Sequence, residues 1–295
     1  TPAEIQRVLE LRPLGIEFIE GTVTDAAALA RAAEGMKVIY HLAAAQHEAN
    51  VPEAHFAAIN VAGTRNVLAA AAAAGAARVV YGSTIGVYGA SGAEPVHEQT
   101  PLQPDSAYGR TKLAAEEVVR GAAPEITTAI VRITETYGPG DYRLLKLFRG
   151  IARRRFIRIG SGANLHHPIY IDDLVEALRQ AAAAPAAVTG PLVVCGPTPL
   201  STDAMIDAVA RAVDAAPPRV HWPMAPFQGA ATLCERVCVP LGLHPPLHRR
   251  RLDFFRKSFA FNGSEARRQL NFTPQVDFET GAQRTAQWYR ERQLL

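Results

Sequence analysis

This sequence of 295 residues contains few cysteines, carries little net charge and has no long apolar run. Its three cysteines are too few for a disulfide framework, so we expect free thiols in a reducing compartment. The formal net charge is only +3, and the short basic clusters lack interleaved aromatic residues, which disfavours nucleic-acid binding. The longest apolar run, residues 67–77, is too short to span a membrane. We therefore predict a cytoplasmic protein without a metal site, a nucleic-acid partner or a membrane partner.

Two clusters of three arginines, Arg153–Arg155 and Arg249–Arg251, are the densest basic segments. We interpret each as a solvated face of a helix or loop. The alternative, a contact with an anion or a phosphate group, stays open.

Apolar strands and helices alternate along most of the chain, as is typical of parallel βαβ units. The sequence therefore predicts an α/β fold, a Rossmann-like doubly wound parallel sheet. Helices and proline-rich loops dominate after Ser201, which suits a smaller C-terminal domain. We expect strands at 15–20, 37–42, 78–81, 127–132 and 192–195, and helices at 25–34, 61–74, 108–120, 144–154 and 172–184. Thr24 is the expected N-cap of the first of these helices.

Tyr108 and Lys112 stand four residues apart at the start of an apolar, alanine-rich helix, so both side chains lie on one helical face. A phenol that exchanges a proton near neutral pH must lower its reference pKa of about 10 by about 3 units, which is roughly 4 kcal/mol. An adjacent cation is one way to supply this stabilisation. The pair indicates an acid–base site or, since this spacing also arises by chance, a solvated tyrosine and lysine.

The β-branched run at 78–84 ends in the hydroxyls of Ser83 and Thr84. This pattern is typical of a buried parallel strand with a polar carboxyl end. In doubly wound folds, ligands bind just beyond such ends. A hydroxyl here and the helix of Tyr108 and Lys112 can therefore converge on one substrate oxygen.

Further short motifs are spread along nearly the whole chain. They are Val38–Ala44, Asn60–Thr64, Ser83-Thr84 before Val87–Gly89, Glu98 ahead of Pro101 and Pro104, Tyr108–Lys112, Val131-Arg132, Tyr137–Gly140, Tyr170–Asp173 and Trp288–Arg290. In this set and order the sequence resembles the extended short-chain dehydrogenases/reductases, which include the NAD-dependent epimerases and dehydratases. The resemblance implies hydride transfer with a nicotinamide cofactor, NAD or NADP. It also implies two domains: an NAD(P)-binding Rossmann domain of residues 1–140 and 168–197, and a substrate-binding lid domain of residues 141–167 and 198–295.

The resemblance assigns catalytic roles to three residues. Thr84 hydrogen-bonds the reacting oxygen while Tyr108 gives or takes its proton, and Lys112 lowers the pKa of the phenol and holds the nicotinamide ribose. Asn60 matches an asparagine near the cofactor and is also expected to cap the helix that follows it. The implied cofactor contacts are Thr22, Val23, Leu42, Ala43, Ala44, Gln46, Asn60, Tyr108, Lys112 and Thr134, and the implied substrate contacts are Ser83, Thr84, Glu135 and His166.

Departures from the family pattern indicate which cofactor and substrate groups the site can bind. Thr22 stands where the family usually carries an aspartate against the adenine, so this contact brings no charge. Ile85-Gly86 replaces the Asp-Glu of dehydratases, which argues against a 4,6-dehydratase because elimination needs an added acid and base. Glu135 and His166 replace an asparagine and an arginine of nucleotide-sugar enzymes. A carboxylate facing a diphosphate is unfavourable by a few kcal/mol, so unless Glu135 turns away it weakens nucleotide-sugar binding.

A dinucleotide-binding fold should open with a strand, a Gly-x-x-Gly-x-x-Gly turn and a helix, because the glycines let the backbone approach the pyrophosphate. The sequence has no such turn. About 40 residues of a usual βαβ module are missing ahead of the strand expected at 15–20. We favour a fragment of a longer gene product over a lineage that lost dinucleotide binding, and we expect the chain as given to bind NAD weakly or not at all.

These observations favour an NAD(P)-dependent oxidoreductase acting at a secondary alcohol or ketone carbon. Residues 245–270 resemble the 3β-hydroxysteroid dehydrogenase and dihydroflavonol reductase side of the family, which places a dehydrogenase or reductase slightly ahead of a nucleotide-sugar epimerase. A non-catalytic homologue retained for binding or assembly is a further alternative, which the intact Thr84, Tyr108 and Lys112 disfavour. The resemblance also implies a homodimer in which the helices expected at 61–74 and 108–120 pair as a four-helix bundle.

Overall fold

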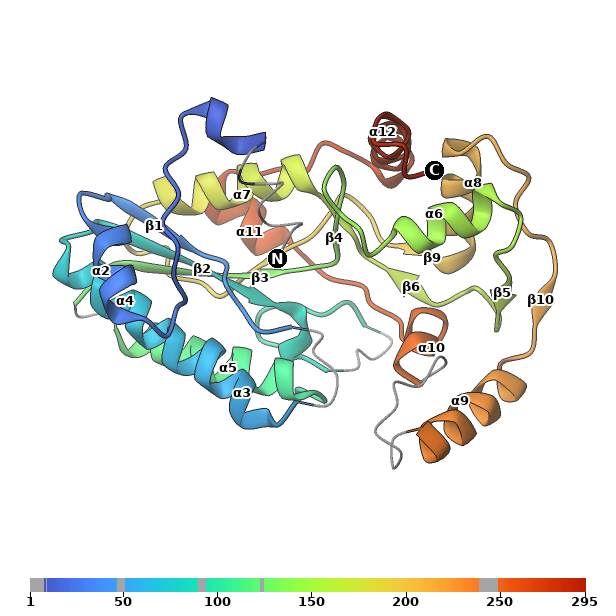
Figure 1. The fold of residues 1–295 in the computed structure, drawn as a ribbon, viewed down its shortest axis with the longest axis horizontal. Coiled ribbons are helices and arrows are strands. Elements are labelled where there is room, and N and C mark those ends of the chain that lie inside the picture. Colours follow the sequence, from blue (N-terminus) through green and yellow to red (C-terminus); the bar gives the residue numbers. More distant parts are fainter. Residues whose placement is uncertain (1–7, 9, 47–50, 90–93, 123–124, 239–248) are drawn as a thin grey trace. The chain divides into compact units, whose positions relative to one another are not determined.

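The chain forms two compact units in the computed structural model, which describes residue 8 and residues 10–46, 51–89, 94–122, 125–238 and 249–295 (Figure 1). The first unit consists of Thr1–Ser83, Ser106–Ile130 and Pro185–Gly190. The second consists of Thr84–Asp105, Val131–Ala184 and Pro191–Leu295. The domain boundaries expected from the sequence stay a prediction.

A parallel sheet with the strand order β1-β2-β3-β8 is the framework of the fold. In the first unit β1 pairs with β2, and His41 lies opposite Tyr81. The strand β3 begins in the first unit and continues into the second, where it pairs with β8. This sheet with its crossover helices confirms the predicted Rossmann-like α/β fold. The strands are β1 (Val38–His41), β2 (Arg78–Thr84), β3 (Thr128–Ile133) and β8 (Leu192–Val194).

In the first unit, α4 and α5 lie side by side along one face of β1 and β2 (Figure 1). Val79 and Tyr81 of β2 are fully buried against this helical layer. Ala71 of α4 and Ala115 of α5 are also fully buried, because their small side chains let the helices approach closely. The helical elements of this unit are η1 (Arg12–Leu14), α2 (Ala26–Ala33), α3 (Glu53–Ala57), the π-helical turn η2 (Ala58–Ala62), α4 (Gly63–Ala73) and α5 (Ala107–Gly121).

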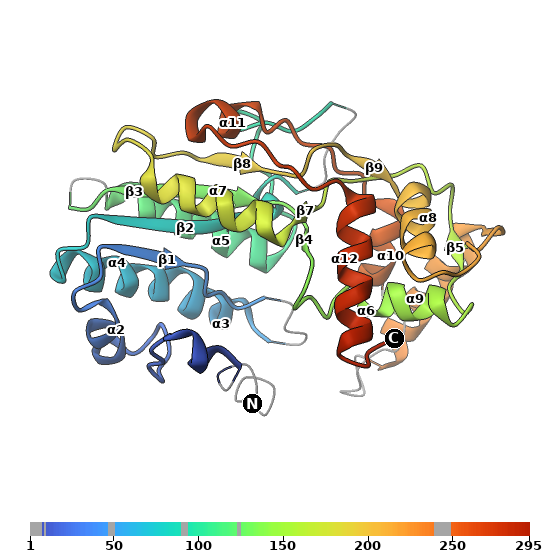
Figure 2. The same cartoon turned by 90° about the horizontal axis from the view of Figure 1, so that it is seen from above.

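The second unit has its main core where α6, α8 and α12 pack together (Figure 2). Phe148, Ile206 and Tyr289, one from each helix, are fully buried there. A smaller cluster around Ala231 and Leu252 joins α9 to α10. The remaining elements are η3 (Ile85–Val87), β4 (Thr136–Tyr137), α6 (Leu145–Ala152), β5 (Arg158–Ile159), β6 (Leu165–His166), β7 (Ile169–Tyr170), α7 (Ile171–Ala183), β9 (Leu200–Ser201), α8 (Thr202–Ala212), β10 (His221–Trp222), α9 (Met224–Cys238), α10 (Arg249–Arg256), α11 (Ser264–Leu270) and α12 (Phe278–Glu291).

Three expectations about local structure are wrong. Residues 15–20 form no strand, and their apolar side chains Ile16 and Phe18 are 45% and 36% exposed, because this segment pairs with no other strand in the described part of the chain. The N-cap of α2 is Asp25 and not Thr24, since the Asp25 carboxylate accepts hydrogen bonds from two backbone amides. The helix expected from residue 61 begins at Glu53, so Asn60 lies inside it and is not its N-cap.

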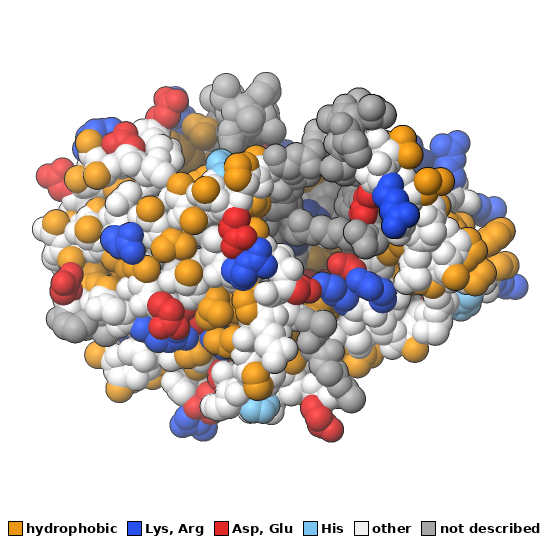
Figure 3. Space-filling model, turned by 90° about the horizontal axis from the view of Figure 1, so that it is seen from below, with side chains coloured by type: hydrophobic (Ala, Val, Ile, Leu, Met, Phe, Trp, Pro, Cys, Tyr) orange, Lys and Arg blue, Asp and Glu red, His pale blue; other side chains and the backbone are white. Residues whose placement is uncertain are grey.

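Among the described residues, no helix combines the length and the apolar character that crossing a membrane requires. Acidic and basic side chains are interspersed over the face drawn in Figure 3, in keeping with the net charge of +3.

Candidate active site

Lys112 is a buried cation at the carboxyl end of β2. Its side chain lies on α5 and is only 1% exposed. The Nζ atom donates a hydrogen bond of 2.6 Å to the carbonyl oxygen of Gly82 and lies 4.1 Å from the centre of the Tyr81 ring. Burial lowers the pKa of Lys112 to about 7, against the opposing effect of the Glu116 carboxylate. The amine therefore changes its protonation state near neutral pH.

Tyr108 lies one helical turn before Lys112, in the first turn of α5. The start of this helix is fixed by Ser106, whose side chain accepts a hydrogen bond of 3.1 Å from the backbone amide of Gly109. The capped start and the four-residue spacing place the half-buried Tyr108 on the same helical face as Lys112. The local structure thus supports the pairing that the sequence predicts.

Asn60 ties the loop after β1 to α5. Its Oδ1 accepts a hydrogen bond of 2.8 Å from the amide of Ala45, and its Nδ2 donates to the Ala45 carbonyl at 3.2 Å and to Thr111 Oγ1 at 3.0 Å. This loop, residues 42–46, contains four of the predicted cofactor contacts, and Leu42 is 52% exposed in it. Asn60 thereby fixes the path of the segment that is expected to meet the cofactor.

His41 and Thr64 extend this buried network. Thr64 Oγ1 donates to the Asn60 carbonyl at 2.6 Å, so at its contact of 2.9 Å with His41 Nε2 it must accept, and Nε2 carries the proton. Burial, helped by the charge of Lys112, lowers the pKa of His41 to about 4. His41, Thr64 and Thr111 were not among the predicted site residues, although each stands within or beside a motif that the sequence analysis singled out.

The two adjacent hydroxyls at the end of β2 have different partners. Ser83 Oγ donates to Glu116 Oε1 at 2.6 Å, and the other oxygen of this fully buried carboxylate accepts from Arg120 at 2.9 Å. Thr84 Oγ1 accepts a hydrogen bond of 3.1 Å from the amide of Gly86. In the described part of the chain no acceptor is assigned to the Thr84 hydroxyl proton, so Thr84 is better suited than Ser83 to donate to a ligand.

In the second unit, the predicted substrate residues Glu135 and His166 contact each other. His166 is 2% exposed, and its Nδ1 lies 3.2 Å from Glu135 Oε2, whereas the Glu135 side chain is 43% exposed. The other ring nitrogen, Nε2, lies 3.0 Å from Thr202 Oγ1. Glu135 follows β3 directly, so this pair places a partly solvated carboxylate just beyond the end of a central strand.

Thr134, between β3 and Glu135, is a buried residue with an unsatisfied side chain. Its amide donates a hydrogen bond of 3.2 Å to the Val194 carbonyl. Its Oγ1 has no hydrogen-bond partner among the described residues. A buried hydroxyl without a partner costs free energy, so it is available to a ligand.

The motif from Tyr108 to Lys112, the sheet and its helices agree with a direct family assignment. A profile of the NAD dependent epimerase/dehydratase family matches residues 2–196, so the chain belongs to this family. Membership confirms the resemblance found in the sequence. It also confirms, at the level of the family, the predicted nicotinamide cofactor.

Individual relatives catalyse different reactions. The 2-alkyl-3-oxoalkanoate reductase of Stenotrophomonas maltophilia (strain K279a) is 30% identical, over 93% of this chain and 87% of the relative. The UDP-glucose 4-epimerase of Mycolicibacterium smegmatis is 28% identical, over 94% and 83%. The solved structure of the dTDP-glucose 4,6-dehydratase DesIV from Streptomyces venezuelae, with NAD and TYD bound, is 26% identical with a TM-score of 0.71, over 92% of this chain and 79% of that one. These relatives share the family but differ in the reaction that they catalyse.

The surroundings of Lys112 fit a nicotinamide ribose. An ammonium group has three hydrogen-bond donors. Among the described residues only the Gly82 carbonyl accepts from Nζ, although the side chain is almost completely buried. The remaining donor capacity matches the hydroxyl oxygens of a ribose, because buried donors are normally satisfied.

Proposed function

We propose that this protein is an NAD(P)-dependent dehydrogenase or reductase that acts at a secondary alcohol or ketone carbon. The single observation that carries the proposal is the buried Lys112 amine, held at the end of β2 one turn from Tyr108. A lysine without a ligand is not expected at this position, because burying an ammonium group costs free energy unless a partner or a ligand compensates it. The cofactor, when bound, supplies or accepts the hydride.

Tyr108 is the proposed acid–base group. In the direction of reduction its hydroxyl donates a proton to the substrate oxygen, and in oxidation it takes the proton back. A protonated Lys112 on the same helical face favours the phenolate form through its positive charge. Thr84 donates its hydroxyl proton to the same oxygen and orients it, because its own oxygen is occupied by the Gly86 amide.

The other proposed site residues bind the cofactor and the substrate. Thr22, Val23, Leu42, Ala43, Ala44 and Gln46 would lie against the adenosine half of the cofactor, and Asn60 would position this surface through Ala45. Thr134 would contact the nicotinamide. Ser83, Glu135 and His166 would line the substrate side.

A ketone or alcohol without a diphosphate is the substrate class that the charges favour. Glu135 leaves a carboxylate 43% exposed beyond β3, and a negative diphosphate placed against it would be repelled. Ile85 and Gly86 form part of η3 and bring no acid or base to the site, which speaks against a 4,6-dehydratase. A nucleotide-sugar epimerase is the alternative, and the likeness to the UDP-glucose 4-epimerase supports it.

Turnover by a full-length version of the protein, as the wild type and as the variant Tyr108→Phe, tests the proposal, because the chain as given is expected to bind NAD weakly or not at all. Oxidation of NADH and NADPH is followed with 3-oxo compounds, and epimerisation of UDP-glucose is followed in parallel. Tyr108→Phe should lower kcat at least about a hundredfold, the usual contribution of a general acid or base. Tyr40→Phe, which alters an exposed tyrosine of β1, is the matched control and should not change kcat. Equal rates for Tyr108→Phe and wild type would refute the mechanism, and an inactive wild type would favour a non-catalytic homologue.

The protein is further proposed to form a homodimer and to reside in the cytoplasm. A homodimer through α4 and α5 is supported by the way the two helices pack side by side within one chain, since two such pairs can form a four-helix bundle. Light scattering tests it, and a monomer at micromolar concentration would contradict it. The cysteines Cys195, Cys234 and Cys238 are all free thiols, which suits a reducing cytoplasm.

A further inference from the structure

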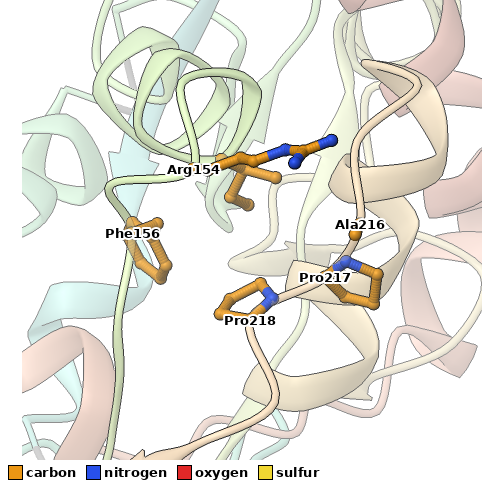
Figure 4. Close-up of a pocket in the computed structure, with 6 residues that line it drawn as sticks. Arg154, Phe156, Ala216, Pro217 and Pro218 are labelled. Carbon is orange, nitrogen blue, oxygen red and sulfur yellow. The ribbon is translucent and has the colours of Figure 1, made fainter.

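The second unit contains a cavity of about 190 Å³ (Figure 4). Arg154, an exposed residue, is the charged residue among those that line it. None of the cavity's residues belongs to the proposed active site. The lining residues are Ile151, Arg154, Phe156, Ala216, Pro217 and Pro218.

The cavity forms where two packed helices end. Just beyond α6, Arg154 has a left-handed backbone with φ of 56°, and just beyond α8, Asp214 has the same φ. Hydrogen bonds then tie each following segment back to its helix, from the Phe156 amide to the Gly150 carbonyl at 3.0 Å and from the Ala215 amide to the Ala210 carbonyl at 2.9 Å. These bonds give the cavity fixed walls.

The left-handed backbone of Arg154 is unusual, because side chains other than glycine rarely adopt it and asparagine or aspartate is preferred there. Such a conformation is unfavourable for an arginine and is held by its surroundings. The Arg154 side chain runs along one edge of the hollow toward the segment that leads to Ala216, while Phe156 and Pro218 face the hollow (Figure 4).

Arg154 has no acidic partner among the residues that the structure describes. In this part of the chain the same holds for its neighbours Arg153 and Arg155. The acidic residue nearest in sequence to the opposite wall, Asp214, forms an ion pair of 2.9 Å with Arg290. An unpaired cation therefore borders an apolar hollow.

We propose that this cavity binds a small organic anion, whose carboxylate pairs with Arg154 and whose apolar body lies between Phe156 and Pro218. A guanidinium is the group best suited to a carboxylate, since its donors match both oxygens. The volume lies below the roughly 300–1,000 Å³ that hold drug-sized ligands, so a short acyl chain or a single ring fits. This site is additional to the proposed reaction and does not depend on it.

Three probes of related structure test the proposal by NMR titration of the full chain. Hexanoate carries both the charge and the apolar body, 1-hexanol carries the body alone, and acetate carries the charge alone. Hexanoate should bind at least about tenfold more tightly than either of the others, because each loses one of the two contacts. Equal binding of hexanoate and 1-hexanol would overturn the role of Arg154.

A pair of variants locates the binding. Arg154→Gln should weaken hexanoate binding about five- to tenfold, whereas Arg153→Gln, which removes the neighbouring charge, should leave it unchanged. Thermal unfolding of both variants checks that they are folded. Equal losses in the two variants would show a diffuse basic surface and overturn the site. Tyr108→Phe should bind hexanoate like the wild type, so a failure of the proposed reaction leaves this result intact.

Discussion

The Nζ atom of Lys112 lies 2.6 Å from the carbonyl oxygen of Gly82, and this bond joins the second turn of α5 to the last residues of β2. Helix and strand are thereby held in register at the point where Ser83 and Thr84 follow. Since Ser83 is also bonded to Glu116 of the same helix, two bonds in succession fix the strand end to the helix. The proposed catalytic groups of α5 are therefore placed by the backbone of β2.

Replacing Lys112 by methionine should abolish turnover and yet stabilise the fold at pH 7. Because the pKa of Lys112 falls from 10.5 to about 7 on folding, the unfolded chain binds more protons between these values, and this group destabilises the fold most below pH 7. Removing it should raise the free energy of unfolding by about 1–2 kcal/mol at pH 7, net of the lost bond to Gly82. The gain should shrink toward pH 10, as urea unfolding at several pH values can measure.

The control for this prediction is Lys37→Met, which removes an exposed lysine. Its unfolding free energy should follow the wild type at every pH. A Lys112→Met variant that is less stable than the wild type at pH 7 would show that the buried amine is compensated within the protein, and the argument for a ribose ligand would fall with it.

Acid should destabilise the second unit through His167. Its Nε2 donates to the Gly196 carbonyl at 3.0 Å, and its Nδ1 accepts from the Phe261 amide at 3.1 Å, so protonation would break the second bond. Burial lowers the pKa of His167 from 6.5 to about 4. The unfolded histidine therefore takes up a proton first, and about 2 kcal/mol of stability should be lost between pH 7 and pH 5.

His167→Gln should flatten this pH dependence, because glutamine has no titrating group, while His97→Gln, which alters an exposed histidine, should not. Thermal unfolding at pH 7 and pH 5 measures both. The interpretation fails if His167→Gln and the wild type lose equal stability on acidification.

Asn60→Ala should weaken the fold and cofactor binding together. The variant leaves the backbone groups of Ala45 without their side-chain partners, and unsatisfied buried groups cost about 1–3 kcal/mol. The KM for the nicotinamide cofactor should rise more than kcat falls, because the loop of residues 42–46 is released. Asn164→Ala is the comparison, since the Asn164 side chain also bonds backbone groups, the carbonyls of Phe254 and Lys257, but holds no predicted cofactor contact. If both variants behave alike, Asn60 has no special role in positioning the loop.

Glu135→Gln should improve the binding of nucleotide sugars. Glutamine keeps the shape and a hydrogen bond to His166 but removes the negative charge. The affinity for UDP-glucose, measured by calorimetry, should increase about tenfold, which is about 1.4 kcal/mol, whereas KM for an uncharged ketone should stay the same. Glu125→Gln, at another exposed carboxylate, is the control. Unchanged affinity for UDP-glucose would mean that Glu135 does not select the substrate.

The arrangement of the α/β fold and the spacing of Tyr108 and Lys112 could be predicted from sequence because both follow from local periodicity. The pKa of Lys112 could not, since it depends on burial by residues distant in the chain. Residues 15–20 have the apolar pattern of a strand, but a strand forms only where a neighbouring strand supplies its backbone hydrogen bonds, and none pairs with this segment among the described residues. Asn60 was expected to cap a helix because asparagine favours that position, whereas the helix already begins at Glu53, after Pro52.

The π-helical turn η2 has a consequence for how the chain tolerates length changes. A single helix runs from Glu53 to Ala73 and contains one wide turn, Ala58–Ala62, with Asn60 at its centre. Such turns hold one residue more than a regular α-helix would. Deleting one residue within η2 would therefore restore regular geometry and leave the later side chains, Thr64 included, on their present faces of the helix. Deleting one residue from a regular part of the helix would instead turn every later side chain about 100° around the axis. The contact of Thr64 with His41 should thus survive a deletion in η2 better than a deletion elsewhere between Glu53 and Gly63.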